Sequence, residues 1–274
     1  MDQDKHGAVI KHYTSRHELR GDTFGQQPYA NYGYWTRPQQ SIEQAATALT
    51  TLVGAAAGLG SGDELLDVGC GYGAGAVRFV QQFGVSKVIG IDVTQIRISS
   101  GLEYVARNNL EEQIHLRLGD ATRIDEADAS FDKLVSVECA FHFDTREQFL
   151  GEAARVLRPG GVLALTDMIP ADGVDPASYQ LGQRTVHSDV CLDMPANAYP
   201  AAQYRQILER SGFVDVRIES IVRWTRLPFA DALDALGRNS EGERRQMLCR
   251  MAERNREQVA LGEDYVLVSA RKAG

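Results

Sequence analysis

The sequence predicts an α/β protein built on a parallel, doubly wound sheet. Through the middle of the chain, apolar strand-like segments alternate with helical segments, and no hairpin turn separates them. Such alternation requires crossover connections, which join parallel strands. A glycine-rich turn follows the first of these strands directly and opens a helix. The chain has 274 residues, more than one minimal domain needs and fewer than two, so we expect one domain with an elaborated cap.

Each element of the core is predicted from apolar periodicity and from the turn residues that bound it. Ser41 and Gln44 form a capping box before an amphipathic helix over 42–53. Asp144 is the predicted N-cap of a helix over 145–156. The other predicted core elements are strands at 64–68, 87–92, 114–118, 133–137 and 162–166, and helices at 74–83 and 96–108.

The chain beyond the core adds further helices and two closing strands. A helix over 201–211 is predicted to end at Gly212, a residue type common just after a helix. The alternating segments 214–222 and 265–271 are predicted strands. The helical stretch 229–259 between them would lie over one end of the sheet.

The composition and the spacing of certain residues exclude several classes of protein. Lys and Arg total 29 against 37 Asp and Glu, so the net charge is −8, and no long basic run is present. We therefore expect no nucleic-acid partner and no membrane partner. No signal peptide and no apolar run of membrane-spanning length is found, so we expect a cytoplasmic protein. No metal site is expected, because the four cysteines form no C-x-x-C pair and the spacing of His6, His12 and His17 fits no ordinary ligand set.

The strongest local signal is a glycine loop over 67–73, with the sequence Asp-Val-Gly-Cys-Gly-Tyr-Gly. Glycines at such a turn let the backbone approach a ligand closely. Asp92 ends the next strand, where a carboxylate can accept both hydroxyls of an adenosine ribose. Together they indicate a nucleoside site, which fits NAD(P) or S-adenosylmethionine; the alternative is a tight turn with no ligand.

Three further segments distinguish between these ligands. Asp120 and Ala121 follow the third strand, FDKLV over 131–135 begins the fourth, and RVLRPGG over 155–161 precedes the fifth. In this order the motifs resemble those of class I S-adenosylmethionine-dependent methyltransferases, over residues 62–168. The resemblance implies a Rossmann-like sheet of seven strands with the last one antiparallel. It also implies S-adenosylmethionine as the cofactor and a small-molecule acceptor.

The same resemblance assigns cofactor-binding residues and a domain organisation. The residues carried over are Asp67, Gly69, Cys70, Gly71 and Gly73 at the methionine end, Asp92 at the ribose, Val93 and Thr94 beside the adenine, Asp120 and Ala121 at its amino edge, and Glu138 after the fourth strand. The implied organisation is an N-terminal lid at 1–40, a cofactor-binding core at 41–169, a substrate cap at 170–260 that includes a strand at about 213–222, and a closing strand at 261–274.

The segment Asn31-Tyr32-Gly33-Tyr34-Trp35 is similar to one that precedes the core of antibiotic-pathway small-molecule O-methyltransferases. The erythromycin-type sugar O-methyltransferases and the mitomycin and rebeccamycin methyltransferases belong to this group. Their N-terminal Tyr and Trp close over the cofactor, so Tyr34 is a predicted cofactor contact. Aromatic faces attract a cationic sulfonium by about 0.5–2 kcal/mol. The alternative is a hydrophobic staple for the next helix.

The predicted base is His142, which follows the fourth strand at the end of the sheet where such folds place their sites. A histidine titrates near neutral pH, and an alcohol acceptor needs a base as the new bond forms. In the sugar O-methyltransferases, a histidine here and an aspartate at the end of strand five are the proposed pair. The matching aspartate is Asp167, which would orient His142 or act as a second base. Alternatively, His142 packs between Phe141 and Phe143, and Asp167 is a cap.

The predicted function is methyl transfer to a hydroxyl of a small-molecule natural product. C-methylation of an isoprenoid stays open, with Phe141, Phe143, Glu138 and Tyr179 as candidate carbocation-stabilising residues, and so does N-methylation. An NAD-dependent oxidoreductase and a non-catalytic binding module are the other classes considered. A homodimer is plausible for this group. His187 is a further candidate substrate contact, and the arginines over 244–256 form either a solvated helix face or a grip for an anionic acceptor.

Overall fold

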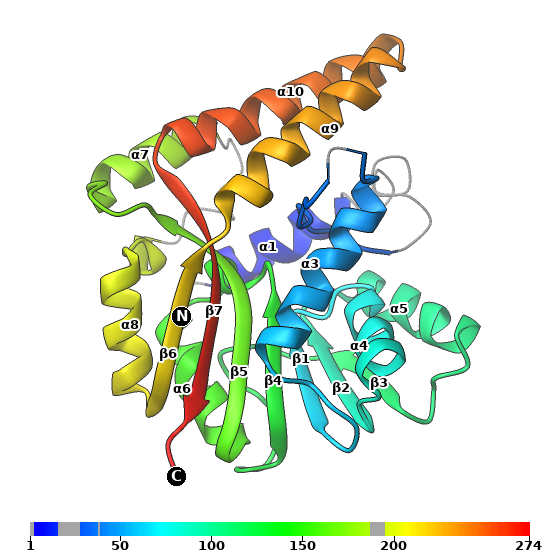
Figure 1. Ribbon diagram of the computed structural model, residues 1–274, viewed down its shortest axis with the longest axis vertical. Coiled ribbons are helices and arrows are strands. Elements are labelled where there is room, and N and C mark those ends of the chain that lie inside the picture. The colour runs from blue at the N-terminus through cyan, green and yellow to red at the C-terminus, as the bar shows by residue number, and fades with distance from the viewer. Residues whose placement is uncertain (1–2, 16–27, 38, 187–194) are drawn as a thin grey trace.

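The computed structural model describes residues 3–15, 28–37, 39–186 and 195–274, which form a seven-stranded sheet with helices on both faces (Figure 1). The strands lie in the order β3-β2-β1-β4-β5-β7-β6. Strands β1 to β5 are parallel, whereas β7 is antiparallel to both β5 and β6. The predicted seven-stranded Rossmann-like sheet with an antiparallel last strand is therefore confirmed. The strand bounds are β1 Glu64–Val68, β2 Lys87–Asp92, β3 Ile114–Leu118, β4 Phe131–Val137, β5 Leu157–Pro170, β6 Phe213–Ser220 and β7 Glu263–Lys272.

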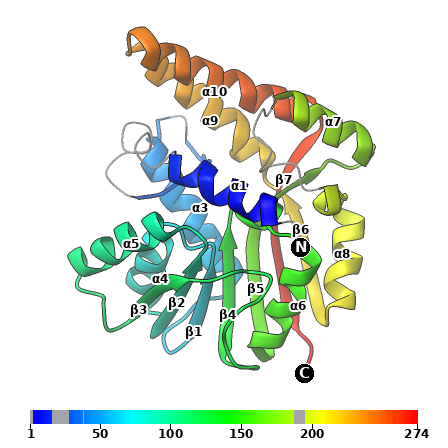
Figure 2. The same cartoon turned by 180° about the vertical axis from the view of Figure 1, so that it is seen from behind.

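The helices form two layers over the sheet and a third group at its carboxyl end (Figures 1 and 2). Helices α3, α4 and α5 cover one face, and α6 and α8 cover the other. Within the described residues, no helix combines the length and apolarity that a membrane crossing requires. The bounds are α1 Gln3–Ser15, α3 Ile42–Ala56, α4 Ala74–Phe83, α5 Gln95–Arg107, α6 Arg146–Val156, α7 Pro176–Val186, α8 Ala201–Arg210, α9 Arg226–Arg238 and α10 Gly242–Ala260.

The two layers follow from the alternation of side chains along each strand. On β1, Leu65 packs under α3 and α4, whereas its neighbour Leu66 packs under α6. On β4, Val135 and Leu134 divide between the two faces in the same way. These strands are buried on both sides, which explains why their sequences are nearly continuous apolar runs. The carboxyl ends of the parallel strands stay free of these layers and open toward α1 and the cap.

The cap is a hairpin of α9 and α10 that packs on the amino end of α3 (Figure 1). Phe229 and Leu233 of α9 and Leu248 of α10 form its core together with Trp35 and Ile42. Helix α7 packs against α10. On the other side, α1 lies across the end of the sheet at which β1 and β4 finish (Figure 2). The site is therefore bounded by segments from both ends of the chain.

Several boundaries differ from those predicted. Helix α6 begins one residue late because Thr145, not Asp144, is its N-cap, with the Gln148 N–H donating to Thr145 Oγ1 at 3.3 Å. Strand β5 spans 157–170, because β7 pairs with it from Val162 to Pro170. The helices α1 and α7 were not predicted.

Candidate active site

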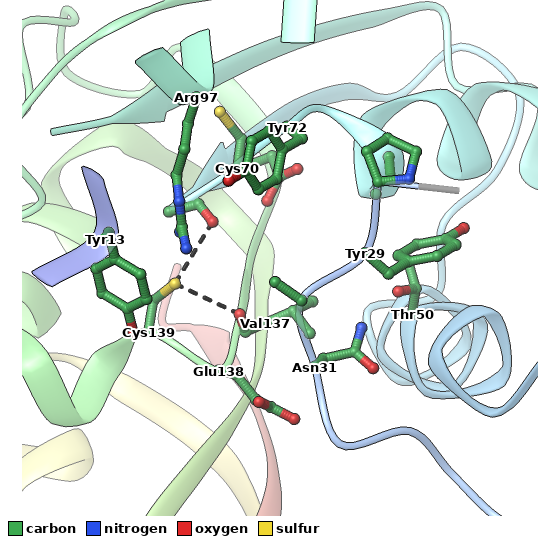
Figure 3. Close-up of a pocket in the computed structure, with 17 residues that line it drawn as sticks. Tyr13, Tyr29, Asn31, Thr50, Cys70, Tyr72, Arg97, Val137, Glu138 and Cys139 are labelled. Atoms are coloured by element: carbon green, nitrogen blue, oxygen red, sulfur yellow. Dashed lines mark hydrogen bonds between the residues drawn. The ribbon is translucent and has the colours of Figure 1, made fainter. Parts of the chain in front are cut away.

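A cavity lies at the carboxyl ends of β1 and β4 (Figure 3). The glycine loop after β1 and residues Val137 to Cys139 after β4 form its floor. Tyr13 of α1 and the segment 28–31 close it from above. Crevices of this kind form where the connections that follow two neighbouring strands run to opposite faces of the sheet. They are the usual ligand sites of doubly wound sheets.

The glycine loop has a backbone that only glycine adopts readily. Gly69, Gly71 and Gly73 have φ values of +76°, +54° and +73°. A Cβ on Gly69 would lie 2.3 Å from the Sγ of Cys139, so the loop also presses directly on the residue after β4. Gly73 is the N-cap of α4 and has no side chain to cap it. The loop therefore presents backbone at the cavity wall, together with Cys70 and the amino end of a helix.

Asp67 is a buried carboxylate that lines the cavity. It is 3% exposed, and its side chain makes no hydrogen bond to any residue that the structure describes. Burial, with a further contribution from Asp92, raises the pKa of Asp67 to about 7. A buried carboxylate without a partner is costly, and a cationic group in the cavity would remove that cost. S-adenosylmethionine carries a sulfonium and an ammonium, so the residues present fit this cofactor.

Glu138 is a second buried carboxylate on the cavity wall. Its Oε1 accepts hydrogen bonds from the Tyr32 N–H at 2.7 Å and from the Tyr265 hydroxyl at 2.6 Å. Burial raises the pKa of Glu138 to about 7 despite these bonds. Its φ of +55° is unusual for a residue other than glycine and turns the chain away from the strand direction as it leaves β4. Both acidic groups lie beside the glycine loop, so this end of the cavity favours positive charge.

Asp92 lies one layer behind the cavity wall. Its carboxylate accepts hydrogen bonds from the Gly71 N–H at 3.0 Å and the Thr94 N–H at 2.8 Å, so it fixes the loop of β1 to that of β2. The Arg97 guanidinium lies 3.9 Å from it and lines the cavity in front of it. Arg97 was not predicted as a site residue. Its only sequence signal is its position in the first turn of the helix after Asp92.

The predicted adenine contacts are not part of the cavity wall. Val93, Thr94, Asp120 and Ala121 lie outside the set of residues that line it. The Asp120 carboxylate caps its own turn, accepting from the Thr122 N–H and hydroxyl at 2.8 Å each. The structure thus gathers Asp67, Gly69, Cys70, Gly71 and Glu138 at the cavity, and leaves the adenine assignment as an expectation.

His142 lies behind the cavity wall and makes contact with α1. It ends a short 3-10 turn, Ala140–His142, directly after β4 and is 8% exposed. The Tyr13 hydroxyl lies 2.5 Å from His142 Nε2, and the two rings meet edge to face at 5.4 Å. The Arg97 guanidinium lies over the same Tyr13 ring, 3.9 Å from its centre. Tyr13 was missed by the sequence analysis, because helix α1 itself was not predicted.

The prediction that Asp167 orients His142 or serves as a second base needs correction. Asp167 is fully buried inside β5, which continues to Pro170, and Arg146 Nε lies 2.6 Å from its Oδ2. The Tyr204 hydroxyl and the Met168 N–H donate to the same carboxylate at 3.0 and 2.9 Å. A carboxylate with these three partners is committed to the protein interior, so it is not available to take a proton from an acceptor.

The Tyr34 ring packs against Trp224, with centres 6.0 Å apart, and does not line the cavity, so its predicted contact with the cofactor stays an expectation. The aromatic segment reaches the site through other residues. Tyr29 and Asn31 line the cavity, and the Tyr32 N–H holds Glu138. Gly33 explains the difference, because a Cβ there would lie 2.6 Å from that of Ala45 and its φ of +76° turns the chain.

The residues considered for other roles are dispersed. Phe143 packs on Phe149 with ring centres 4.8 Å apart, and neither Phe141 nor Tyr179 is among the residues that line the cavity. His187 lies outside the described residues. Arg256 of α10 forms ion pairs with Asp231 and Asp234 of α9, which favours a structural role for it. No group of three or more His, Cys, Asp or Glu in the described part of the chain could hold a metal ion.

Comparison with known proteins places these features in a family. Residues 66–165 match the methyltransferase domain family. The erythromycin 3''-O-methyltransferase of Saccharopolyspora erythraea is 33% identical over 196 residues, which cover 70% of this chain and 64% of that enzyme. The 27-O-demethylrifamycin SV methyltransferase of Amycolatopsis mediterranei is 29% identical over 88% of this chain and 89% of its own length.

A solved structure is similar over the whole chain. It is a geranyl diphosphate C-methyltransferase from Streptomyces coelicolor A3(2), in complex with Mg²⁺, geranyl diphosphate and S-adenosyl-L-homocysteine. Its TM-score is 0.75 at 16% identity, over 99% of each chain, so the likeness is one of fold. The family match identifies residues 66–165 as a methyltransferase domain, and the strand order and the glycine loop are those of class I S-adenosylmethionine-dependent methyltransferases.

Proposed function

We propose that the enzyme transfers the methyl group of S-adenosylmethionine to a hydroxyl of a small-molecule natural product, with His142 as the general base. The observation that carries the proposal is the Tyr13 hydroxyl at 2.5 Å from His142 Nε2. Tyr13 also lines the cavity, so a hydroxyl group on the cavity side is within reach of this nitrogen. In our proposal, the acceptor hydroxyl takes the place of the Tyr13 hydroxyl when it binds.

In this proposal, different residues bind different parts of the cofactor. Asp67 and Glu138 offer negative charge to its cationic groups, and the loop of Gly69 and Gly71 gives its methionine end close backbone contact. Asp92, which now holds the Gly71 and Thr94 N–H groups, is the proposed ribose ligand. Val93, Thr94, Asp120 and Ala121 remain the proposed adenine neighbours, and Tyr13, rather than Tyr34, is the proposed aromatic contact.

S-adenosylmethionine supplies a methyl group on a good leaving group, so the protein mainly aligns the acceptor and removes a proton. Holding two reactants in line contributes roughly 7–11 kcal/mol to lowering a barrier. The His142 Nε2 accepts the proton of the acceptor hydroxyl as the oxygen–carbon bond forms, and a positioned base of this kind contributes about 10²–10⁴-fold in rate. The negative charges of the acidic groups in the cavity help to orient the cationic cofactor.

The test is transfer of a labelled methyl group to a panel of acceptors. The panel contains 27-O-demethylrifamycin SV, glycosylated polyketides, simple phenols, amines and prenyl diphosphates. A labelled methyl ether as the product, which no longer forms with His142→Ala, supports the proposal. Label on carbon would favour C-methylation, for which Glu138 at the cavity wall is a candidate carbocation-stabilising residue, and would overturn the role of His142 as base for a hydroxyl. Label on nitrogen would assign an amine acceptor.

Two further expectations concern the compartment and the oligomeric state of the enzyme. We place the enzyme in the cytoplasm, and we expect a homodimer as in similar small-molecule methyltransferases. Light scattering coupled to size-exclusion chromatography tests the second expectation. A mass near 30.1 kDa, that of one chain, would contradict it.

A further inference from the structure

One side chain from the segment between α7 and α8 holds the backbone on both sides of His142. Asn197 ends a short 3-10 turn, Pro195–Asn197, just before α8, and is 5% exposed. Its Nδ2 donates to the Phe143 carbonyl at 2.8 Å and to the Phe141 carbonyl at 3.2 Å. The Phe141 carbonyl belongs to the peptide group that precedes His142, and the Phe143 carbonyl to the peptide group that follows Phe143, so a single amide holds the backbone on both sides of the proposed base.

Asn197 is itself anchored by Arg146, the first residue of α6. The Arg146 N–H donates to Asn197 Oδ1 at 2.9 Å, and Arg146 Nη1 donates to the Asn197 carbonyl at 2.8 Å. Both side-chain polar atoms of Asn197 are therefore used, and all their partners lie more than 50 residues away in sequence. A buried amide with every hydrogen bond made has one orientation, which makes it a rigid support.

Asp167 completes the chain of contacts. The fully buried Arg146 guanidinium pairs with Asp167 at 2.6 Å, and its face lies over the rings of Tyr199 and Tyr204 at 4.7 Å each. A buried arginine needs such a counter-charge to stay in place. The link from Asp167 to His142 thus runs through Arg146 and Asn197.

We propose that Asn197 is a positioning residue that fixes the orientation of the His142 imidazole toward the cavity. This inference rests on the proposed function, since it assigns Asn197 a role in the reaction only if His142 is the base. It also connects the segment between α7 and α8, to which Asn197 belongs, to the proposed chemistry. The geometry predicts that removing the amide donor misplaces the base without changing the cofactor site.

The first test does not depend on the acceptor. The chain has six histidines, and in ¹⁵N-histidine-labelled protein the imidazole signals of His142 are those lost in His142→Ala. In the wild type we expect one sharp set for His142. In Asn197→Ala and Asn197→Asp we expect this set to broaden or double while the other histidines keep their signals. Asn197→Asp keeps the acceptor for the Arg146 N–H but lacks the donor, so it isolates the clamp on the two carbonyls.

Tyr204→Phe is the matched control for loosening of the buried cluster. It removes one hydrogen bond to Asp167 and leaves all three bonds of the Asn197 side chain. We expect the His142 signals of Tyr204→Phe to match the wild type. A His142 signal unchanged in Asn197→Asp, or disturbed equally in Tyr204→Phe, would overturn the proposal.

The second test uses the panel acceptor that takes the label. Asn197→Ala and Asn197→Asp should lower kcat about 10–100-fold, as small misplacements of catalytic groups do. The affinity for S-adenosyl-L-homocysteine should change less than about 3-fold, because Asn197 is not among the described residues that line the cavity. In a His142→Ala background, the Asn197 change should have no further effect on kcat.

The two failures are distinguishable. An equal loss of kcat in the presence and absence of His142 would make Asn197 a merely structural residue. A wild-type rate in Asn197→Asp together with a slow His142→Ala would overturn the role of Asn197 and leave the base in place. A wild-type rate in His142→Ala would overturn the proposed function and this inference with it.

Discussion

Replacement of Asp67 by asparagine should make the stability of the ligand-free protein less dependent on pH. The carboxylate is 3% exposed, faces the cavity, and has its pKa raised from 3.8 to about 7 by burial and by Asp92. A folded-state pKa above the unfolded value means that the folded protein binds more protons between about pH 4 and 7. Stability therefore falls as the pH rises through that window, and it falls no further above it.

The magnitude follows from the pKa difference. The span from 3.8 to about 7, at about 1.36 kcal/mol for each pH unit, corresponds to roughly 4 kcal/mol of lost stability when the buried group ionises. Water that enters the cavity reduces this value, so 4 kcal/mol is an upper limit. Relative to the wild type, Asp67→Asn should gain stability between pH 5 and pH 8 by a substantial part of this amount.

The assay is urea unfolding of wild type and Asp67→Asn at several pH values between 5 and 8, without ligand. The quantity that matters is how the difference in unfolding free energy changes with pH, since the substitution also alters local hydrogen bonding. Asp128→Asn, at a side chain that is 79% exposed, is the matched control and should change stability by less than about 0.5 kcal/mol. A difference between wild type and Asp67→Asn that stays constant with pH would refute the reasoning. The same variant should bind S-adenosylmethionine more weakly, because the anionic partner is gone.

Three further outcomes are expected. His142→Ala should lower turnover about 10²–10⁴-fold with little change in cofactor affinity, measured by steady-state kinetics and calorimetry; intact turnover would remove the base assignment. Asp92→Ala should weaken S-adenosylmethionine binding in calorimetry, because it loses the proposed ribose ligand and the Gly71 N–H partner; unchanged affinity would speak against the ribose contact. Asp167→Ala should destabilise the protein by about 3–5 kcal/mol, because it leaves the fully buried Arg146 without its counter-charge. A loss below about 1 kcal/mol in denaturant unfolding would show that the ion pair is not needed.

Much of the core could be predicted from the sequence because its signals are local. The glycine loop, the residues that bound each strand, and Asp67 and Glu138 at strand ends all follow from short-range patterns. The ends of α4 and of β1, β2 and β3 agree with the structure to the residue. Parallel strands that bring their carboxyl ends together convert these local signals into one site.

The rest depends on contacts between distant parts of the chain. Tyr13 reaches His142 across 129 residues, and Asn197 reaches Phe141 and Phe143 across more than 50. Neither contact leaves a periodic or motif-like trace in the sequence. The sequence indicates Asp167 as a site residue, but its ion pair with Arg146 forms only when α6 packs on β5. The packing of the Tyr34 ring on Trp224 depends on the tight contact of Gly33 with α3, which the pattern of aromatic residues does not reveal.

The central claim is base-assisted transfer to oxygen, and it is tested most directly by locating the methyl group in the product. Single-turnover reactions with trideuteromethyl-labelled S-adenosylmethionine, analysed by mass spectrometry and NMR, give both the labelled atom and the rate. We expect label on an ether oxygen, transferred at least about 100-fold more slowly by His142→Ala than by the wild type. Label on carbon, or equal rates for the two proteins, would contradict it.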